Sequence, residues 1–583
     1  MRSADLASLL PLPVAIPIVG AICAPLVARI DRRAPLVVAV LCLVAATAVL
    51  GAFAPRVFGG EIVAHYMGGW VPVGGQALGI AFAADPFGLA YALAATTIGA
   101  VLLVSTLSEL GGLGARELGG YACLFQLLLA ALIGTALTAD LFNLFVWFEV
   151  AALSSYGLTG FFLERPIALE AAFKVLTLTT LASFAIFVGA TLLYANHGAL
   201  NFGQLHAAVS GHPHTADMVA LALLVCGFAT KAGLVPFHGW LPDAHTAAPG
   251  PVSALFSGLM VSLGIVAIAR ITLQIYGPTG GRPVLGLLMA GGVISALAGA
   301  LLALGQDDLK RLLAYDTISQ MGVLAVGLAT AVPAGVAGAG YHLIDHALYK
   351  SLLFLVAGAI VHATGATRLS EMGGLARHRP VLALAFTAGV VAIAGVPPLN
   401  GYPSLGLIHE ALTGSGQYAA NLAMVAAQVI TVAALARAAW LAFYRRRPEP
   451  YDDLARPRTG QVVAFWTLAL ACLAAGVFPN WILVHAAAPA AASLLHAAPY
   501  ATGVLTGSAH LPHLAVSFDY FKPTELLSVA GTALAGLLLA AAYLRIAEPA
   551  PIRLLRALHT GSVNDYAAFS AVGILCAVVV LAV

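Results

Sequence analysis

Charged residues are scarce in this sequence. Only 9% of its 583 residues are Asp, Glu, Lys or Arg, whereas 61% are apolar. A soluble domain carries about 25% charged residues, so this chain could not cover a globular surface with polar groups. Apolar runs recur from Leu9 to Val583, and each approaches the roughly 20 residues that span a bilayer. The composition excludes a soluble protein and predicts an all-α polytopic membrane protein in a lipid bilayer.

Metal-binding and nucleic-acid-binding patterns are also missing. The cysteines stand alone inside apolar runs, none with CxxC spacing, which argues against a metal or iron–sulfur site. They are Cys23, Cys42, Cys123, Cys226, Cys472 and Cys576. The net charge is only +2 and the basic residues are scattered, so no nucleic-acid partner is expected. No nucleotide-binding or haem motif is present, and we expect no cofactor and no redox chemistry of the chain's own.

Hydrophobic runs predict about sixteen transmembrane helices. Their ranges are 7–29, 34–54, 85–107, 117–138, 140–163, 170–194, 216–236, 250–276, 284–305, 310–331, 338–362, 381–412, 418–444, 462–483, 526–546 and 564–583. The first run is too long for a typical signal sequence and is expected to stay in the protein as a helix.

The distribution of basic residues predicts the orientation of the chain. With the N-terminus outside, only four of the 27 Lys and Arg residues fall in outer loops, namely Arg2, Arg56, Arg282 and Lys522. Five lie within helices and the rest fall inside, as expected for cytoplasmic loops. We therefore expect a multi-pass protein of a bacterial-type cell (inner) membrane with both termini on the outer side.

Five basic residues lie within the predicted helices. Lysine or arginine at the bilayer centre costs about 2.5–3.5 kcal/mol. Lys174, Arg270 and Arg437 lie nearer predicted helix ends, and we expect them to reach the interface with their long side chains. Lys231 and Lys350 stand among other polar or helix-breaking residues and are candidates for function.

Proline interrupts two of the helices. The seventh contains Lys231-Ala-Gly-Leu-Val-Pro236, and the twelfth contains Gly395-Val-Pro397-Pro398-Leu-Asn-Gly401. Proline removes a backbone donor, and a broken backbone is tolerated at membrane depth only inside protein or beside a wet cavity. Each broken helix is fourth in a block of five, which predicts two inverted repeats formed by helices 4–8 and 9–13.

These repeats divide the chain into four predicted regions. Residues 1–115 would hold helices 1–3, residues 116–278 the first repeat, residues 279–446 the second repeat, and residues 447–583 helices 14–16.

A buried carboxylate and a buried lysine form the first candidate site. Glu149 lies inside the fifth helix, at the end of the run Asp140-Leu-Phe-Asn-Leu-Phe-Val-Trp-Phe-Glu. Lys231 on the broken helix is its candidate partner. A buried lysine holds its proton while a carboxylate is close and tends to release it when the pair opens. The alternative is a static ion pair between two helices, although buried pairs are poor stabilisers.

The second candidate site is a row of titratable residues in the eleventh helix. His342, His346 and Lys350 are spaced i, i+4 and i+8, so they share one helix face. Such a row suits a proton relay through a membrane. Metal binding by the two histidines and simple polar packing remain as alternatives, although no third metal ligand is evident.

With these motifs in order, the chain resembles the antiporter-like family that comprises large membrane subunits of respiratory complex I, the A and D subunits of Mrp-type sodium/proton antiporters, and hydrogenase membrane subunits. The matching motifs are Asp140 to Glu149, Lys231 with Pro236 to His245, Asp308 to Tyr315, His342 to Lys350 and Pro397 to Gly401. The run before Glu149 is most similar to the corresponding run of the Mrp D subunit. The resemblance implies Glu149 and Lys231 as the proton-loading pair, and Lys310 with His342, His346 and Lys350 as a central hydrophilic axis.

Three features depart from the pattern that the resemblance implies. Ser262 stands where many relatives carry a lysine, and Leu405 stands where relatives carry the lysine or glutamate of the outlet. His409, one turn after Leu405, with Glu410 beside it, could replace that outlet residue; otherwise the second half-channel is inactive. The polar linker at about 553–567 is too short for the long lateral helix of the largest complex I membrane protein.

Three functions remain open on the sequence. The first is a subunit that moves protons, or sodium in exchange for protons, together with other membrane subunits. The second is the pumping arm of a complex that oxidises NADH, ferredoxin or hydrogen, in the manner of an NADH-quinone oxidoreductase. The third is a scaffold, or a component of an uptake system for another solute such as inorganic carbon.

Overall fold

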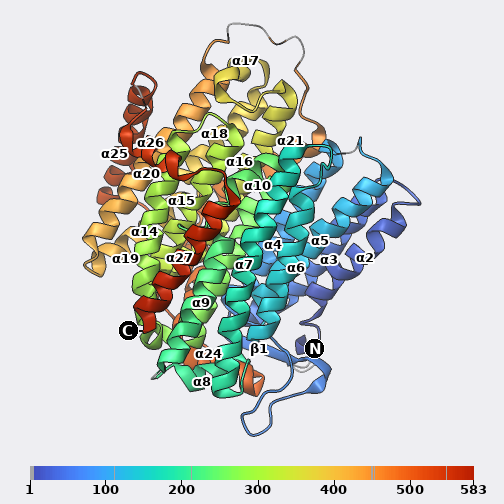
Figure 1. Ribbon diagram of the computed structural model, residues 1–583, viewed down its shortest axis with the longest axis vertical. Helices are drawn as coiled ribbons and strands as arrows, with labels where there is room; N and C mark the ends of the chain where they lie inside the picture. The colour runs from blue at the N-terminus through green and yellow to red at the C-terminus, as the bar shows by residue number, and fades with distance from the viewer. Residues whose placement is uncertain are drawn as a thin grey trace.

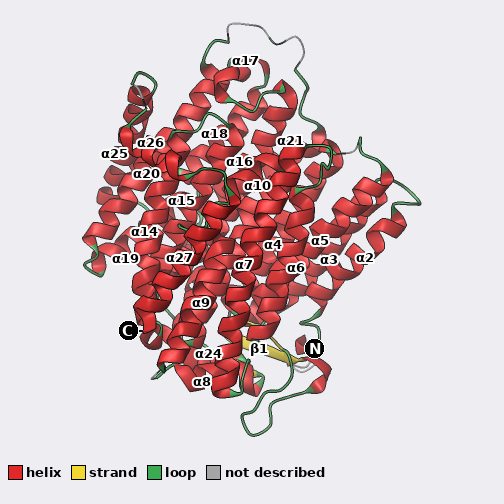
Figure 2. Cartoon of the chain, viewed as in Figure 1, coloured by secondary structure: helices red, strands yellow, loops and turns green. Residues whose placement is uncertain are grey.

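The computed structural model describes residues 6–110, 112–211, 213–447, 451, 454–546 and 548–582. These residues form a bundle of long helices that run side by side (Figures 1 and 2). Within the described ranges, fourteen helices are long and apolar enough to cross a membrane, and a bent helix pair could add a fifteenth. The expectation of an all-helical polytopic membrane protein is confirmed. Arg2, which is expected on the outer side, lies outside the described residues.

Seven of these helices belong to the first half of the chain. They are α3 (Ala34–Val57), α4 (Pro86–Glu109), α5 (Ala115–Leu137), α6 (Leu141–Thr159), α7 (Pro166–His197), α9 (Thr215–Ala232) and the helix Gly250–Ile275. The last is continuous but changes its winding, through α11 (Gly250–Leu255), η2 (Phe256–Met260), α12 (Val261–Ala269) and η3 (Arg270–Ile275).

The other seven belong to the second half. They are α14 (Arg282–Leu304), α15 (Leu309–Ala329), α16 (Pro333–Thr364), α20 (Tyr418–Ala439) continued by η5 (Trp440–Tyr444), α21 (Thr459–Val477), α25 (Pro523–Tyr543) and α27 (Val563–Ala582). Shorter helices are α2 (Leu12–Val27), α8 (Phe202–Val209), α10 (Leu241–Ala247), α13 (Gly277–Gly280), α17 (Leu375–His378), α18 (Pro380–Ile393), α19 (Gly401–Gly414), α22 (Pro479–Ile482), η6 (Leu483–Ala487), α23 (Ala488–Leu495), α24 (Ala497–Thr506) and α26 (Ala550–Leu558).

Every predicted range contains a helix, but the ranges miss several short helices and one bent helix pair. The pair Pro479–Leu495 and Ala497–Thr506 is bent by 88° and lies mostly beyond the predicted helix 462–483, where no further helix was expected. Pro489 and two histidines interrupt its apolar pattern. The count of sixteen spans stays a prediction, because α2 and α18 are shorter than a full span.

A small sheet lies at one end of the bundle, near the N-terminus (Figure 2). It pairs β1 (Glu61–Tyr66) with β2 (Ala81–Ala84) and with β3 (Ser508–His510), both antiparallel. The register places Val63 opposite Ala84 and Glu61 opposite His510. The sheet was not predicted, because its short strands lie in loops between hydrophobic runs. It ties the tail of the chain to the N-terminal helices.

Both predicted helix breaks are present. α9 ends at Ala232 and α10 begins at Leu241, whereas α18 ends at Ile393 and α19 begins at Gly401. Each break begins with a glycine of positive φ, Gly233 at 69° and Gly395 at 67°, a conformation that glycine adopts without strain. Pro236 lies in the first break, and Pro397 and Pro398 lie in the second.

Two correspondences between the halves support the predicted repeats, which stay a prediction. Asp140 caps the start of α6 and Asp308 caps the start of α15, each by accepting a backbone N–H bond. Each aspartate also forms an isolated backbone bridge, Asp140 with Asn201 and Asp308 with Arg368. Both five-helix blocks end in a π-helical turn, η3 and η5.

A buried charge network joins the bent helix pair to the bundle. Arg270 Nη2 lies 2.7 Å from Asp85 Oδ1, with both side chains fully buried. Ser493 donates to Asp85 Oδ2 at 2.7 Å, and Arg270 Nη1 donates to Tyr500 at 3.3 Å. A Cβ at Gly88 would lie 2.1 Å from the carbonyl oxygen of Ala136 and 2.3 Å from Arg270 Nη2. Only glycine leaves room for the guanidinium there.

The burial of Arg270 and Lys174 corrects the expectation that these two side chains reach the interface. Arg270 is fully buried beneath the bent helix pair. Lys174 is only 5% exposed and pairs with Asp243 at 2.8 Å and with Glu170 at 2.7 Å. Arg437 is half-buried and donates to the carbonyl oxygen of Gln306 at 2.7 Å. Tertiary packing, which position along a helix does not reveal, buries these charges.

We expect Arg270→Gln to destabilise the fold strongly, because it leaves Asp85 buried without its cation. Breaking a buried ion pair costs about 3–5 kcal/mol, and the thermal unfolding midpoint of the purified chain in detergent should fall accordingly. Arg282→Gln is the matched control, since Arg282 is exposed and makes no ion pair among the described residues. Equal midpoints for the two variants would refute a stabilising role for the network.

The C-terminal helix α27 packs on the first helix break. A Cβ at Gly239 would lie 2.5 Å from Tyr566 Cγ, and a Cβ at Gly573 would lie 2.7 Å from Pro236 Cγ. Close approach from both sides therefore depends on these two glycines. Part of the predicted polar linker is helical (α26), and the appended tail covers the break of the first half.

Candidate functional site

Lys231 lies in the last turn of α9, immediately before the first break. Its side chain is fully buried. The ammonium nitrogen is 3.4 Å from the hydroxyl of Ser155 and lies 5.8 Å and 5.9 Å from the ring centres of Phe148 and Trp240. Such ring faces attract a cation. The lysine therefore lies in an aromatic pocket with one weak hydrogen bond.

Glu149 does not contact Lys231. It lies on α6, half-buried, and accepts a short hydrogen bond from the hydroxyl of Ser183 on α7. The two residues are both described and form no ion pair, although they interact electrostatically. The predicted pair is therefore open in the structure. Lys231 is hydrogen-bonded to Ser155, and Glu149 is hydrogen-bonded to Ser183.

Lys310 lies at the start of α15, close to Glu109. Its ammonium group donates to the carbonyl oxygen of Ala248 at 2.8 Å and interacts electrostatically with Glu109. Glu109, the last residue of α4, also accepts from Gln461 at 3.4 Å. Glu109 was not predicted as a site residue, because a charged residue at a helix end is normally solvated.

His245 connects Lys310 with the second half. Its ring is fully buried, neither ring nitrogen has a hydrogen-bond partner among the described residues, and it stacks on Phe354 at a centroid distance of 4.6 Å. Its electrostatic neighbours include Lys310 and Lys350. An unpaired buried polar group is costly, and here it lies between two lysines. On the sequence, His245 belongs to a matching motif but has no predicted role of its own.

Lys350 forms a fully buried ion pair with Asp316 of α15. The nitrogen–oxygen distance is 2.5 Å, neither side chain is exposed, and Lys350 also donates to the carbonyl oxygen of Leu313 at 3.0 Å. Asp316 was not predicted as a site residue. An acidic residue inside a predicted transmembrane helix was the signal that could have identified it.

His342 and His346 extend this site along α16 towards the second break. His342 contacts Gln320 Oε1 through Nε2 at 3.0 Å and the hydroxyl of Ser404 through Nδ1 at 3.0 Å. The ring therefore connects Gln320 of α15 with Ser404 of α19. His346 is fully buried, and within the described part of the chain neither of its ring nitrogens has a hydrogen-bond partner.

Asp345 reaches the second break itself. Its side chain is fully buried and lies close to Ser404 and Asn400. Neither carboxyl oxygen meets the geometry of a hydrogen bond with a described residue. Ser404 therefore lies between His342 and Asp345. Asp345 was not predicted as a site residue, because it lies off the face shared by the two histidines and Lys350.

These contacts connect the buried titratable residues in sequence. Lys310 neighbours His245, His245 neighbours Lys350, and the two histidines of α16 continue to Ser404 and Asp345. We call this set the central row: Lys310, His245, Lys350, His346, His342 and Asp345.

The residues at the expected outlets differ in their surroundings. Ser262 is fully buried and its hydroxyl has no hydrogen-bond partner. Leu405 is buried in an apolar cluster with Val326 and Ile408. His409 is partly buried, and its Nδ1 lies 2.5 Å from Asn421 Oδ1, whereas Glu410 is exposed. The outlet role of His409, with Glu410, stays a prediction.

We expect His409→Ala to lower transport, because it removes the titratable group nearest to Leu405 on α19. Glu410→Ala should have a smaller effect, since this side chain is already solvated, and it serves as the matched control. Proton movement in inverted vesicles, followed with a pH-sensitive dye, measures both. Normal transport in both variants, together with a gain in Leu405→Lys, would mean that the second half-channel is inactive in the native chain.

Known proteins are similar to this chain over the segment that contains these residues. Residues 138–431 match the family described as NADH:quinone oxidoreductase/Mrp antiporter, TM. The N subunit of the NADH-quinone oxidoreductase of Desulforudis audaxviator (strain MP104C) is 32% identical over 76% of this chain and 88% of its own length. The D-type protein of the Na(+)/H(+) antiporter of Bacillus subtilis (strain 168) is 29% identical over 78% of this chain and 91% of its own length.

A solved structure gives the same result. One polypeptide in the structure of the Mrp complex from Dietzia sp. DQ12-45-1b superposes with a TM-score of 0.77 at 28% identity, covering 87% of this chain and all of that one. The matched family segment contains both breaks and the whole central row. The chain is a multi-pass membrane protein that belongs to the NADH:quinone oxidoreductase/Mrp antiporter transmembrane family.

Proposed function

We propose that the chain moves protons across a bacterial inner membrane as one subunit of a complex with other membrane subunits. The observation that carries the proposal is the central row. It places buried lysines, histidines and an aspartate next to one another between the first half and the second break. Ionisable residues inside a membrane are costly and mark ion paths.

Lys231 and Glu149 load the proton in this proposal. With the pair open, Lys231 has, among the described residues, only Ser155 and two aromatic rings as partners, and no carboxylate holds its proton. Movement of Glu149 towards Lys231 would favour the ammonium form. The α9 break beside Lys231 supplies the adjustable backbone. The central row, which begins at Lys310, then transfers the proton towards the second half of the chain.

A more specific version of the proposed function is the exchange of Na+ for protons. It is supported by the similarity to the Na(+)/H(+) antiporter protein of Bacillus subtilis and to the Mrp complex of Dietzia. The second candidate is the pumping arm of a redox-driven complex. It is supported by the similarity to the N subunit of NADH-quinone oxidoreductase and to hydrogenase-4 component B of Escherichia coli (strain K12), which is 37% identical over 51% of this chain.

We also propose that both termini of the chain lie on the outer side of the membrane. Figure 1 supports a common side, because the two ends of the chain lie towards the end of the bundle that holds β1, away from α17. The loops near α17 carry Arg368, Arg377, Arg379 and Arg445, and basic loops mark the cytoplasmic side.

Inverted vesicles from cells that express the chain with its neighbouring genes test the proposal. A pH-sensitive dye should report a proton gradient that requires this chain. If added Na+ changes that gradient without a redox substrate, the chain is part of an antiporter. If only NADH, reduced ferredoxin or hydrogen does so, it is a pumping arm. No change in vesicles lacking only this chain would leave it a scaffold and refute transport.

A further inference from the structure

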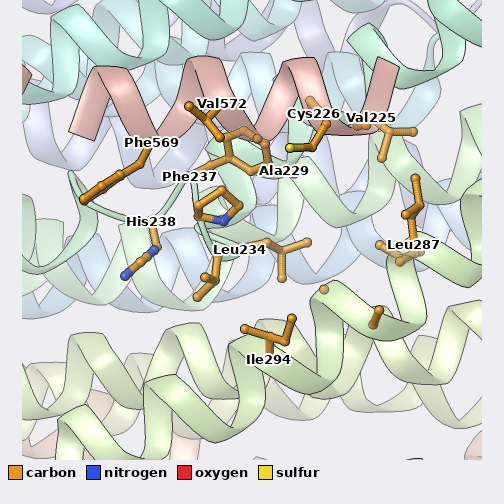
Figure 3. Close-up of a pocket in the computed structure, with 18 of the residues that line it drawn as sticks. Val225, Cys226, Ala229, Leu234, Phe237, His238, Leu287, Ile294, Phe569 and Val572 are labelled. Atoms are coloured by element: carbon orange, nitrogen blue, oxygen red, sulfur yellow. The ribbon is translucent and has the colours of Figure 1, made fainter. Parts of the chain in front are cut away.

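An apolar cavity of 820 Å³ lies between α9, the first break, α14 and the C-terminal helices (Figure 3). Cys226 and Ala229 line it from α9, Leu287 and Ile294 from α14, and Phe569 and Val572 from α27. Its size falls within the usual range of ligand pockets. Neither Lys231 nor any residue of the central row lines it, so it is separate from the proposed proton path.

The bilayer has access to this cavity. Ile294 of α14 is 54% exposed and Val572 of α27 is 59% exposed, and both lie on apolar spans. Cavities without polar lining stay free of water. At membrane depth, the apolar material that can enter such an opening is a hydrocarbon chain.

Most polar atoms of the two histidines at one end of the cavity already have partners; among the described residues, His238 Nδ1 has none. His238 Nε2 lies 2.7 Å from His559 Nε2, and His559 Nδ1 donates to the carbonyl oxygen of Leu555 at 2.8 Å. His559 therefore accepts the proton of His238. Burial lowers the pKa of His559, which lies outside the spanning helices, and this keeps the ring neutral. The lining contains no Asp, Glu, Lys or Arg side chain, so a charged head group would remain outside.

The chain segment that leads into this end carries two exposed arginines, whereas its acidic residue Glu548 is already paired with Arg556. α26 contributes Leu555 and Leu558 to the cavity lining and carries Arg553, which is exposed; Arg545, just after α25, is also exposed. Within the described part of the chain, neither guanidinium has a hydrogen bond or an ion pair. Basic residues beside a pocket between transmembrane helices bind anionic lipid head groups.

We propose that the cavity holds an acyl chain of an anionic phospholipid whose head group binds Arg545 and Arg553. The lipid fills the space between α14 and α27 and so helps to hold the C-terminal helix on the first break. This binding site is independent of the proposed transport function.

Two glycines of α14 offer a matched test of the site. Gly291 lines the cavity, whereas Gly286 does not, and an added Cβ meets no atom within 4 Å at either position. Gly291→Phe should fill the cavity with little strain, and Gly286→Phe should add the same bulk elsewhere on the same helix.

The full chain is purified in mild detergent, and its bound lipid is identified by native mass spectrometry with phosphatidylglycerol or phosphatidylethanolamine added. We expect the native chain and Gly286→Phe to retain phosphatidylglycerol, and Gly291→Phe to lose it. The double variant Arg545→Gln/Arg553→Gln should lose the preference for phosphatidylglycerol. Equal retention by the two glycine variants, no retained phospholipid, or no preference between the two lipids in the native chain would overturn the proposal.

Discussion

Lys231→Ala is expected to reduce coupled transport to the level of vesicles that lack the chain. The substitution removes a fully buried amine whose hydrogen-bond partner among the described residues is Ser155 alone, so it leaves no buried ion pair broken. Assembly and the thermal unfolding midpoint should remain close to those of the native protein. The dye assay in inverted vesicles measures transport, and the amount of assembled protein in the membrane measures folding.

Lys231→Arg distinguishes proton release from a fixed positive charge. Arginine retains the charge but does not lose its proton in proteins. A lysine that loads and releases a proton therefore predicts inactivity in this variant as well, whereas a static charge next to Phe148 and Trp240 predicts activity. Lys522→Ala, in the loop immediately before α25, is the control for loss of a lysine. Normal transport by Lys231→Ala would refute its role.

Local patterns predicted the parts of the fold that depend on local chemistry. Helix ranges follow from the length of apolar runs, and the breaks after Ala232 and Ile393 follow from glycine and proline. The bent pair after Pro479 was missed, because proline and histidine interrupt its apolar run just as they would interrupt a loop.

The candidate site was predicted only in part, because partners come from distant segments. Lys350 was selected from its spacing with two histidines, but its partner Asp316 lies 34 positions earlier on another helix. Glu149 and Lys231 were selected as a pair, yet packing places Ser183 beside Glu149 and Ser155 beside Lys231. Residue types and helix positions indicate which groups are costly to bury, and only tertiary packing shows which groups meet.

Lys350→Met is expected to abolish proton movement through the central row. Methionine retains most of the volume and removes the charge, but it also leaves Asp316 fully buried without its partner. Loss of one partner of a buried ion pair costs about 3–5 kcal/mol. The single variant should therefore lose both transport and stability, and transport measurements alone cannot separate the two effects.

The double variant Asp316→Asn/Lys350→Met separates them. It removes both charges with little change in volume, and replacing a complete buried ion pair with neutral groups is often neutral or stabilising. We expect the thermal unfolding midpoint to recover towards the native value while transport stays absent, because no titratable group remains between His245 and His346. Recovery of transport together with stability would show that Lys350 and Asp316 only hold α15 and α16 together. In that case, the two histidines and Asp345 would have to carry the proton alone.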